Sequence, residues 1–128
     1  FERGELVLRV MGEVTDEQDI YTIQIAPDQH LRPLPPAKFL NHSCNPNLGV
    51  KTSGDGIPDF YAFRDIAIGD ELTFDYAMTE YEIVASDVVC RCGAEQCRGH
   101  LGAWRTLPTL WRERYRGFVA DYLLDMPL

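Results

Sequence analysis

Four cysteines constrain the fold of this 128-residue chain more than any other feature. Cys90, Cys92 and Cys97 lie close together near the C-terminus, and Cys44 lies far upstream in the turn-forming run from Asn41 to Asn47. One tetrahedral zinc ion is satisfied by four thiolates. Ligands on two such turns would therefore pin the C-terminal segment against the middle of the chain.

Disulfide bonding is the alternative for these cysteines, since four of them can form two bridges in a small secreted domain. However, Cys90 and Cys92 are separated by a single residue and would bridge each other only with difficulty. Their Arg-Cys-Gly and Cys-Arg-Gly surroundings are typical of the tight knuckles that wrap zinc. We therefore favour a zinc site and a reducing compartment, either cytoplasm or nucleus.

Composition indicates one folded domain, because 45% of the residues are hydrophobic. The sequence contains no run of about 18 apolar residues that would predict a membrane span, and no secretory signal pattern. Twelve basic residues stand against twenty acidic ones, which gives a net charge of −8. This charge disfavours direct nucleic-acid binding and would attract Lys/Arg-rich polypeptides, although acidity also serves solubility alone.

Alternating apolar residues predict a mainly β protein. The period of two appears from Glu5 to Val10, from Ile20 to Ala26 and from Glu71 to Tyr76. A hairpin is predicted from Leu48–Thr52 and Phe60–Ile66, because a Gly-rich turn separates them.

Two further segments have distinct patterns. The four prolines between Pro27 and Pro36 predict an irregular loop. From Leu107 to Leu123, apolar residues recur every three or four positions, with Thr106 as an N-cap and Pro108 in the first turn. This segment predicts one amphipathic helix whose aromatic stripe packs into the core.

Three motifs in this order resemble the SET domain of protein-lysine methyltransferases followed by its zinc-binding post-SET segment. They are Lys38-Phe39-Leu40-Asn41-His42-Ser43-Cys44-Asn45-Pro46-Asn47, Gly69-Asp70-Glu71-Leu72-Thr73-Phe74-Asp75-Tyr76 and the Cys90-to-Gly99 knuckle. The resemblance implies a β-clip-like fold of several small curved sheets with a pseudoknot, plus a C-terminal helix. It also implies a SET domain over 1–86, a post-SET zinc segment over 87–104 and a helix over 105–128 that packs on the same domain.

The resemblance further implies where the functional residues lie. S-adenosylmethionine would be bound by Lys38, Phe39, Asn41, His42 and Tyr76, and the Tyr76 hydroxyl would lie beside the transferring methyl group. Tyr21 would act with Tyr76 in catalysis and would wall the substrate-lysine channel together with Phe74. A structural Zn²⁺ would be held by Cys44, Cys90, Cys92 and Cys97. Taken singly, Tyr21 and Phe74 would be ordinary core residues and His42 a structural histidine.

The implied activity is methyl transfer from S-adenosylmethionine to a lysine amine of a protein, such as a histone tail. Phe74 corresponds to a position where the family holds either Phe or Tyr, and the missing hydroxyl leaves room for a methylated amine, so we expect di- or trimethylation. The family's Gly-x-Gly loop does not precede Phe1, so half of the cofactor pocket is expected upstream, and Val10 replaces a tyrosine often found near the methyl site. The alternatives are a catalytically inactive SET-like module that binds a basic peptide or partner protein, and methylation of a small-molecule amine.

Overall fold

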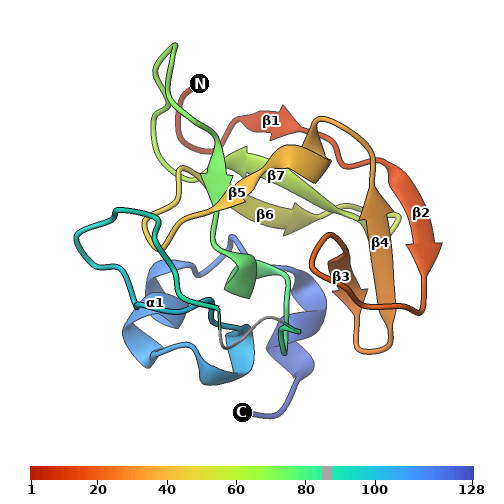
Figure 1. The fold of residues 1–128 in the computed structure, drawn as a ribbon. Helices are drawn as coiled ribbons and strands as arrows, with labels where there is room; N and C mark the ends of the chain where they lie inside the picture. The colour runs from red at the N-terminus through yellow and green to blue at the C-terminus, as the bar shows by residue number, and fades with distance from the viewer. Residues whose placement is uncertain (85–87) are drawn as a thin grey trace.

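The computed structural model describes residues 1–84 and 88–128, and strands dominate it, which confirms the mainly β prediction (Figure 1). Two three-stranded antiparallel sheets and one two-stranded parallel sheet surround the core. The first sheet has the order β1 (Leu6–Leu8), β7 (Pro58–Ala62), β6 (Leu48–Thr52); the second β2 (Gly12–Thr15), β4 (Gln29–Pro33), β3 (Ile23–Ala26); the third β5 (Asn41–His42), β8 (Thr73–Phe74). The predicted boundary between residues 86 and 87 lies outside the described residues.

The predicted hairpin is confirmed. β6 and β7 pair in the antiparallel sense from Leu48 opposite Ala62 to Thr52 opposite Pro58. The second strand begins and ends earlier than predicted, because the turn closes already when Ile57 accepts a hydrogen bond from the Ser53 backbone at 2.9 Å.

The prediction of an irregular loop from Pro27 to Pro36 is wrong, because β4 (Gln29–Pro33) is the central strand of the second sheet. Its residues His30 and Leu31 are buried, and this tertiary burial overrides the local proline signal. Pro33 ends the strand, where a missing N–H group costs least.

The parallel pair of β5 and β8 sets two distant segments side by side. Asn41 lies opposite Thr73, and His42 lies opposite Phe74. The Asn47 side chain fixes this arrangement, because its amide nitrogen donates to the Glu71 carbonyl at 2.7 Å and its oxygen accepts from the Thr73 N–H at 2.9 Å. The predicted strand from Glu71 to Tyr76 is therefore only two residues long.

Short 3₁₀ helices connect these strands to the C-terminal part of the chain. η1 (Ala37–Phe39) precedes β5, and η2 (Tyr76–Met78) follows β8. The Asp75 carboxylate ends the strand because it caps η2, accepting a hydrogen bond from the Ala77 N–H at 3.0 Å.

The C-terminal segment is divided, and the prediction of one helix from Leu107 to Leu123 is wrong. It contains η3 (Trp104–Thr106), α1 (Thr109–Arg114) and η4 (Asp121–Asp125). Gly117 has a φ of +83°, which is a left-handed conformation that a helix does not contain. Among the described residues, no helix has the length and apolar character that a bilayer span requires.

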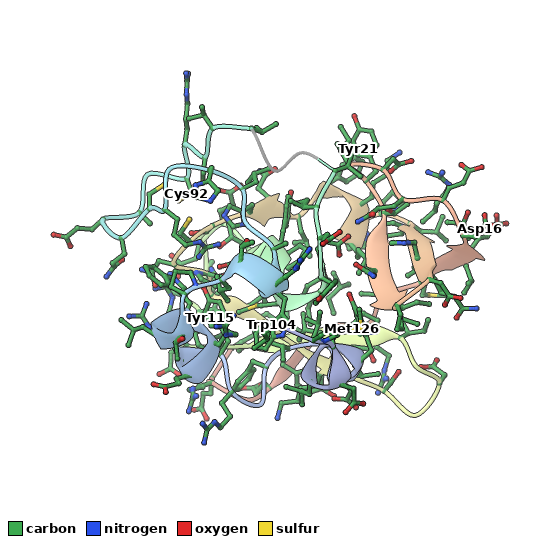
Figure 2. All side chains as sticks on the ribbon, turned by 90° about the horizontal axis from the view of Figure 1, so that it is seen from below. Asp16, Tyr21, Cys92, Trp104, Tyr115 and Met126 are labelled. Atoms are coloured by element: carbon green, nitrogen blue, oxygen red, sulfur yellow. The ribbon has the colours of Figure 1, made fainter. Side chains whose placement is uncertain are left out.

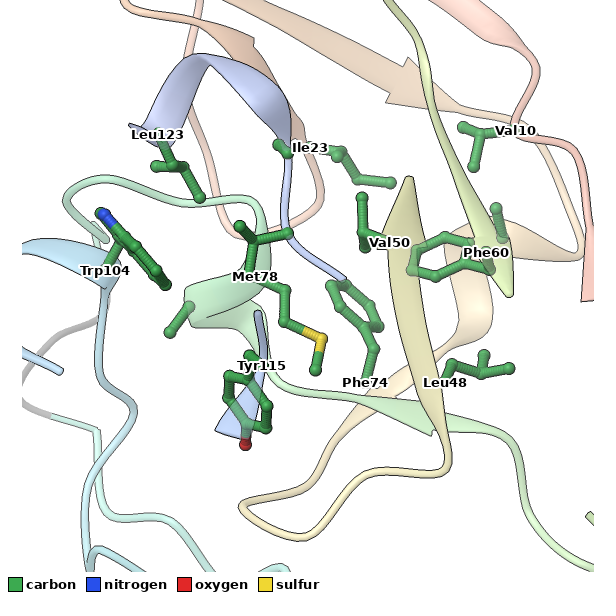
Figure 3. Close-up of a cluster of buried hydrophobic side chains, with 14 of the residues drawn as sticks. Val10, Ile23, Leu48, Val50, Phe60, Phe74, Met78, Trp104, Tyr115 and Leu123 are labelled. Carbon is green, nitrogen blue, oxygen red and sulfur yellow. The ribbon is translucent and has the colours of Figure 1, made fainter. Parts of the chain in front are cut away.

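The aromatic stripe nevertheless packs inside, as predicted. Figure 3 shows Trp104, Tyr115 and Leu123 joining Phe60 and Phe74 in one buried cluster. The core therefore draws on the strands and on the C-terminal segment together.

The close approach of β6 to the C-terminal segment generates a stability prediction. A Cβ atom on Gly49 would lie 2.5 Å from the Phe118 ring, and the Phe118 carbonyl is held by the Val50 N–H at 3.0 Å. Because neither partner can withdraw freely, we expect Gly49→Ala to lower the free energy of unfolding by about 1–3 kcal/mol in urea titrations. The control is Gly54→Ala, where a Cβ atom meets open space; equal stability of the two variants would contradict the packing.

Candidate functional site

The four cysteine thiols converge on one point, although three strands, β6, β7 and β8, separate Cys44 from the others along the chain. Their Sγ atoms all lie within 4.8 Å of one another, and those of Cys44 and Cys90 are 3.8 Å apart. Tetrahedral Zn²⁺ with Zn–S bonds of about 2.3 Å places its sulfurs about 3.8 Å apart. All four cysteines are free, so the residues fit one zinc ion and do not form the two disulfides of the alternative.

Backbone N–H groups point at these sulfurs, as they do in a thiolate cluster. The N–H of Arg98 donates to Cys44 Sγ at 3.4 Å, and that of Gly99 donates to Cys97 Sγ at 3.4 Å. Burial raises the pKa of Cys44, whereas hydrogen bonds outweigh burial and lower the pKa of Cys92 to about 6. A divalent cation would allow all four to ionise together, which chemically suits this donor set.

A cavity of about 450 Å³ lies beside the β5–β8 pair. Its walls come from the turn before β3, from η1 and the start of β5, and from the residues around η2. Six of the predicted cofactor and channel residues line it together: Tyr21, Lys38, Phe39, Asn41, Phe74 and Tyr76.

Phe74 and Tyr76 form the inner wall of this cavity. Their ring centroids are 5.0 Å apart, and the Phe74 ring also packs 4.7 Å from the Phe60 ring. The Tyr76 hydroxyl donates to the Leu40 carbonyl at 3.3 Å, which aims the phenol along the wall. Burial and the neighbouring Glu80 carboxylate raise the pKa of Tyr76, so the phenol is neutral and poorly suited to act as a base.

Tyr21 and Phe39 lie at the mouth of the cavity, 61% and 69% exposed. Tyr21 belongs to a turn and not to the predicted strand, because Asp19 accepts hydrogen bonds from the N–H groups of Tyr21 and Thr22. Figure 2 shows Tyr21 and Cys92 at the same edge of the molecule.

His42 lies behind the cavity and does not line it. Its Nδ1 atom accepts from the Tyr76 N–H at 3.1 Å, and its Nε2 atom lies 3.4 Å from Cys44 Sγ. Burial lowers the pKa of His42, so the ring is neutral and carries its proton on Nε2. The structure therefore places His42 between the cysteine cluster and the Tyr76 backbone, where it reaches the cavity only indirectly.

Glu80 is a wall residue that the sequence did not predict. Its side chain lies in the cavity wall, and the residue is only 5% exposed. Its Oε2 atom accepts from the Gln24 N–H at 2.9 Å and from the Thr79 hydroxyl at 2.7 Å. Burial raises the pKa of Glu80 to about 7. No periodicity or motif marks this glutamate, because its burial depends on β3 packing against the segment that follows η2.

Comparison with known proteins gives consistent matches. The SET domain family model matches residues 2–77. "Histone-lysine N-methyltransferase ASHR3" of Arabidopsis thaliana is 39% identical over 75 residues, which cover 56% of this chain and 14% of that protein. "Histone-lysine N-methyltransferase, H3 lysine-36 specific" of Mus musculus is 30% identical over 139 residues, which cover 91% of this chain and 5% of that protein. The chain thus spans a small part of these relatives.

A solved structure shares the arrangement. It is described as KRYPTONITE in complex with mCHH DNA, H3(1-15) peptide and SAH, and it matches with a TM-score of 0.63 and 26% identity. The match covers 79% of this chain and 25% of that chain. The predicted fold of small sheets is therefore confirmed by a related structure as well as by the strands themselves.

The buried carboxylate generates a pH prediction. The pKa of Glu80 is higher in the folded chain, at about 7, than its ordinary value of 4.5. The folded state therefore binds this proton more tightly, and the chain loses stability as pH rises from about 4.5 to about 7. We expect Glu80→Gln, which keeps an acceptor oxygen, to remove about 2 kcal/mol of that loss between pH 5 and pH 8 in urea titrations.

Glu13→Gln is the control for this measurement, because Glu13 is exposed on β2. The raised pKa of Glu80 is contradicted if Glu80→Gln and Glu13→Gln change the pH dependence of the free energy of unfolding by the same amount.

The thiol cluster generates a metal prediction. Elemental analysis of protein purified without added chelator should find one zinc ion per chain, and Cys97→Ser should lower that content. Chelation should raise hydrogen exchange from Cys90 to Trp104, because the metal bonds hold this segment. Gln96→Ala, an exposed change within the same knuckle, should keep the zinc; zinc-free folded protein would contradict the site.

Proposed function

This chain belongs to the SET-domain family, and from that premise we propose that it transfers methyl groups from S-adenosylmethionine to the side-chain amine of lysine in a protein. The observation that carries the proposal is the shared cavity, which Tyr21, Phe74 and Tyr76 line together with Lys38 to Asn41. An inactive SET-like module is not favoured, since the named relatives are methyltransferases and the cavity keeps its aromatic wall.

The cavity walls suit the chemistry of this transfer. S-adenosylmethionine supplies a methyl group on a sulfonium, and only a neutral amine can attack it. Free lysine has a pKa of about 10.4 and is charged at neutral pH. A cavity walled by the rings of Tyr21, Phe74 and Tyr76 removes water from the amine and favours its neutral form.

We assign the roles of the wall residues accordingly. The neutral Tyr76 phenol orients the reacting groups through its hydroxyl and does not remove a proton. Tyr21, at the exposed mouth, offers an apolar face to the stem of the substrate lysine. Lys38, Phe39 and Asn41 hold the cofactor, and His42 supports that site through the Tyr76 backbone.

Phe74 sets the proposed degree of methylation. A phenylalanine at this wall leaves the space of a hydroxyl group open beside Tyr76. A methylated amine therefore fits as well as a free one, and we assign di- or trimethylation. The masses of the product lysines, measured in the transfer assay below, test this assignment.

A histone tail is the proposed substrate. The named relatives are histone-lysine methyltransferases, and the related structure holds an H3 peptide. The net charge of −8 favours encounter with a lysine-rich tail. The same charge disfavours direct nucleic-acid binding, but the related structure also contains DNA, so that absence stays a prediction.

The metal has a structural role in this proposal. Cys44, Cys90, Cys92 and Cys97 would hold Zn²⁺ with no open position, so the ion fixes the C-terminal segment and takes no part in the transfer. Four free thiols also fit a reducing compartment, cytoplasm or nucleus.

The decisive experiment is incubation of the full-length protein with labelled S-adenosylmethionine and a panel of basic proteins. We expect label on lysine and at least a 100-fold lower rate for Tyr76→Phe, because one oriented hydroxyl is lost from the reacting centre. Its folding should change by only about 1 kcal/mol, since the lost hydrogen bond is long.

Tyr61→Phe is the matched control, because Tyr61 lies on β7 away from the cavity lining. The proposed role of Tyr76 fails if its variant labels as fast as Tyr61→Phe. The proposed function fails if no amine in the panel is labelled.

A further inference from the structure

A buried ion pair joins the cysteine knuckle to the turn that carries Tyr76. The Arg98 guanidinium donates two hydrogen bonds to the Asp75 carboxylate, at 2.7 and 2.9 Å. The side chains of Arg98 and Asp75 are 7% and 0% exposed. Such a bidentate pair fixes both the distance and the relative orientation of the two side chains. Salt screens its attraction only weakly, because the pair is buried away from water.

Asp75 makes further contacts that set the backbone around Tyr76. It accepts from the Ala77 N–H at 3.0 Å and so caps η2, whose first residue is Tyr76. The Tyr115 hydroxyl donates to its other oxygen at 2.8 Å. The Asp75 carboxylate is therefore held from the cysteine knuckle, from η2 and from the C-terminal segment.

Arg98 is equally constrained at its own end. Its N–H donates to Cys44 Sγ, and its guanidinium lies 5.3 Å from the centre of the Trp111 ring. Trp111 in turn donates from Nε1 to the Cys44 carbonyl at 3.3 Å. Both Trp111 and Tyr115 lie beyond residues 2–77, so the C-terminal segment completes this connection.

We propose that the Arg98–Asp75 pair couples the four-cysteine metal site to the cofactor cavity, with Arg98 and Asp75 as positioning residues. If the knuckle loosens, Asp75 keeps a buried charge without its partner, and the turn at Tyr76 must move to rehydrate it. A ligand that requires the ordered turn therefore also favours the ordered knuckle. By reciprocity, zinc and the cofactor then raise each other's affinity by the same factor.

This inference rests on the proposed function, and binding measurements test it without turnover. Zinc affinity of the full-length protein is measured by competition with a chromophoric chelator, with and without saturating S-adenosylhomocysteine. We expect this ligand to tighten zinc binding about tenfold in the unmodified chain. In Arg98→Lys and Asp75→Asn the factor should fall below about twofold, because neither variant keeps the charged two-pronged pair.

Two further variants keep the result interpretable. Tyr115→Phe removes one hydrogen bond to Asp75 and should give an intermediate factor even if the stronger changes unfold the chain. Arg105→Lys alters an exposed ion pair with Glu82 and should leave the factor unchanged.

The possible outcomes separate the two proposals. S-adenosylhomocysteine that binds but leaves zinc affinity unchanged in the unmodified chain overturns the coupling alone. The coupling through this pair is also overturned if S-adenosylhomocysteine still tightens zinc binding tenfold in Arg98→Lys and Tyr115→Phe. That result would assign the coupling to His42, which contacts both Cys44 and Tyr76. If S-adenosylhomocysteine does not bind to the full-length protein without substitutions, the cofactor assignment and the coupling are both overturned.

Discussion

The convergence of four thiols on one point is the constraint on which the rest of this structure depends. Cys44 precedes the β6–β7 hairpin, whereas Cys90, Cys92 and Cys97 follow every strand of the three sheets. Burial raises the pKa of Cys44 and favours its neutral thiol, whereas four ionised thiolates this close together would repel one another. A shared Zn²⁺ would let all four thiols ionise together and would fix how the chain's last third lies on its middle.

The aromatic wall of the cavity is neutral. The Phe74 ring and the Tyr76 phenol line the cavity, and the His42 ring lies behind it. All three are uncharged in the folded chain, because burial opposes ionisation of the two that titrate. The buried charges of Asp75 and Arg98 neutralise each other outside the cavity lining. The same lining also contains the Lys38 amine and two carboxyl groups, those of Asp19 and Glu80, and the pKa of about 7 leaves Glu80 partly protonated.

The sequence predicted the parts of this protein that depend on local pattern or on metal chemistry. The hairpin followed from alternation around a Gly-rich turn, and the convergence of the four thiols from cysteine spacing. β4 was missed because the prolines in and around it indicate a loop, whereas its place in the sheet depends on pairing with the distant residues of β2 and with β3. The break at Gly117 was missed because the apolar period continues across it. Glu80 and the Arg98–Asp75 pair arise only from tertiary contact, so no window of sequence marks them.

The burial of Tyr115 and Leu123 has a consequence for how the molecule is delimited. The match to the SET domain family model ends at residue 77, yet both side chains are fully buried in the core that the earlier residues form. A boundary drawn after the last cysteine would cut through the hydrophobic interior and remove a donor from a carboxylate that has no access to water. The terminal residues through η4 are thus an integral layer of the same hydrophobic core as the strands.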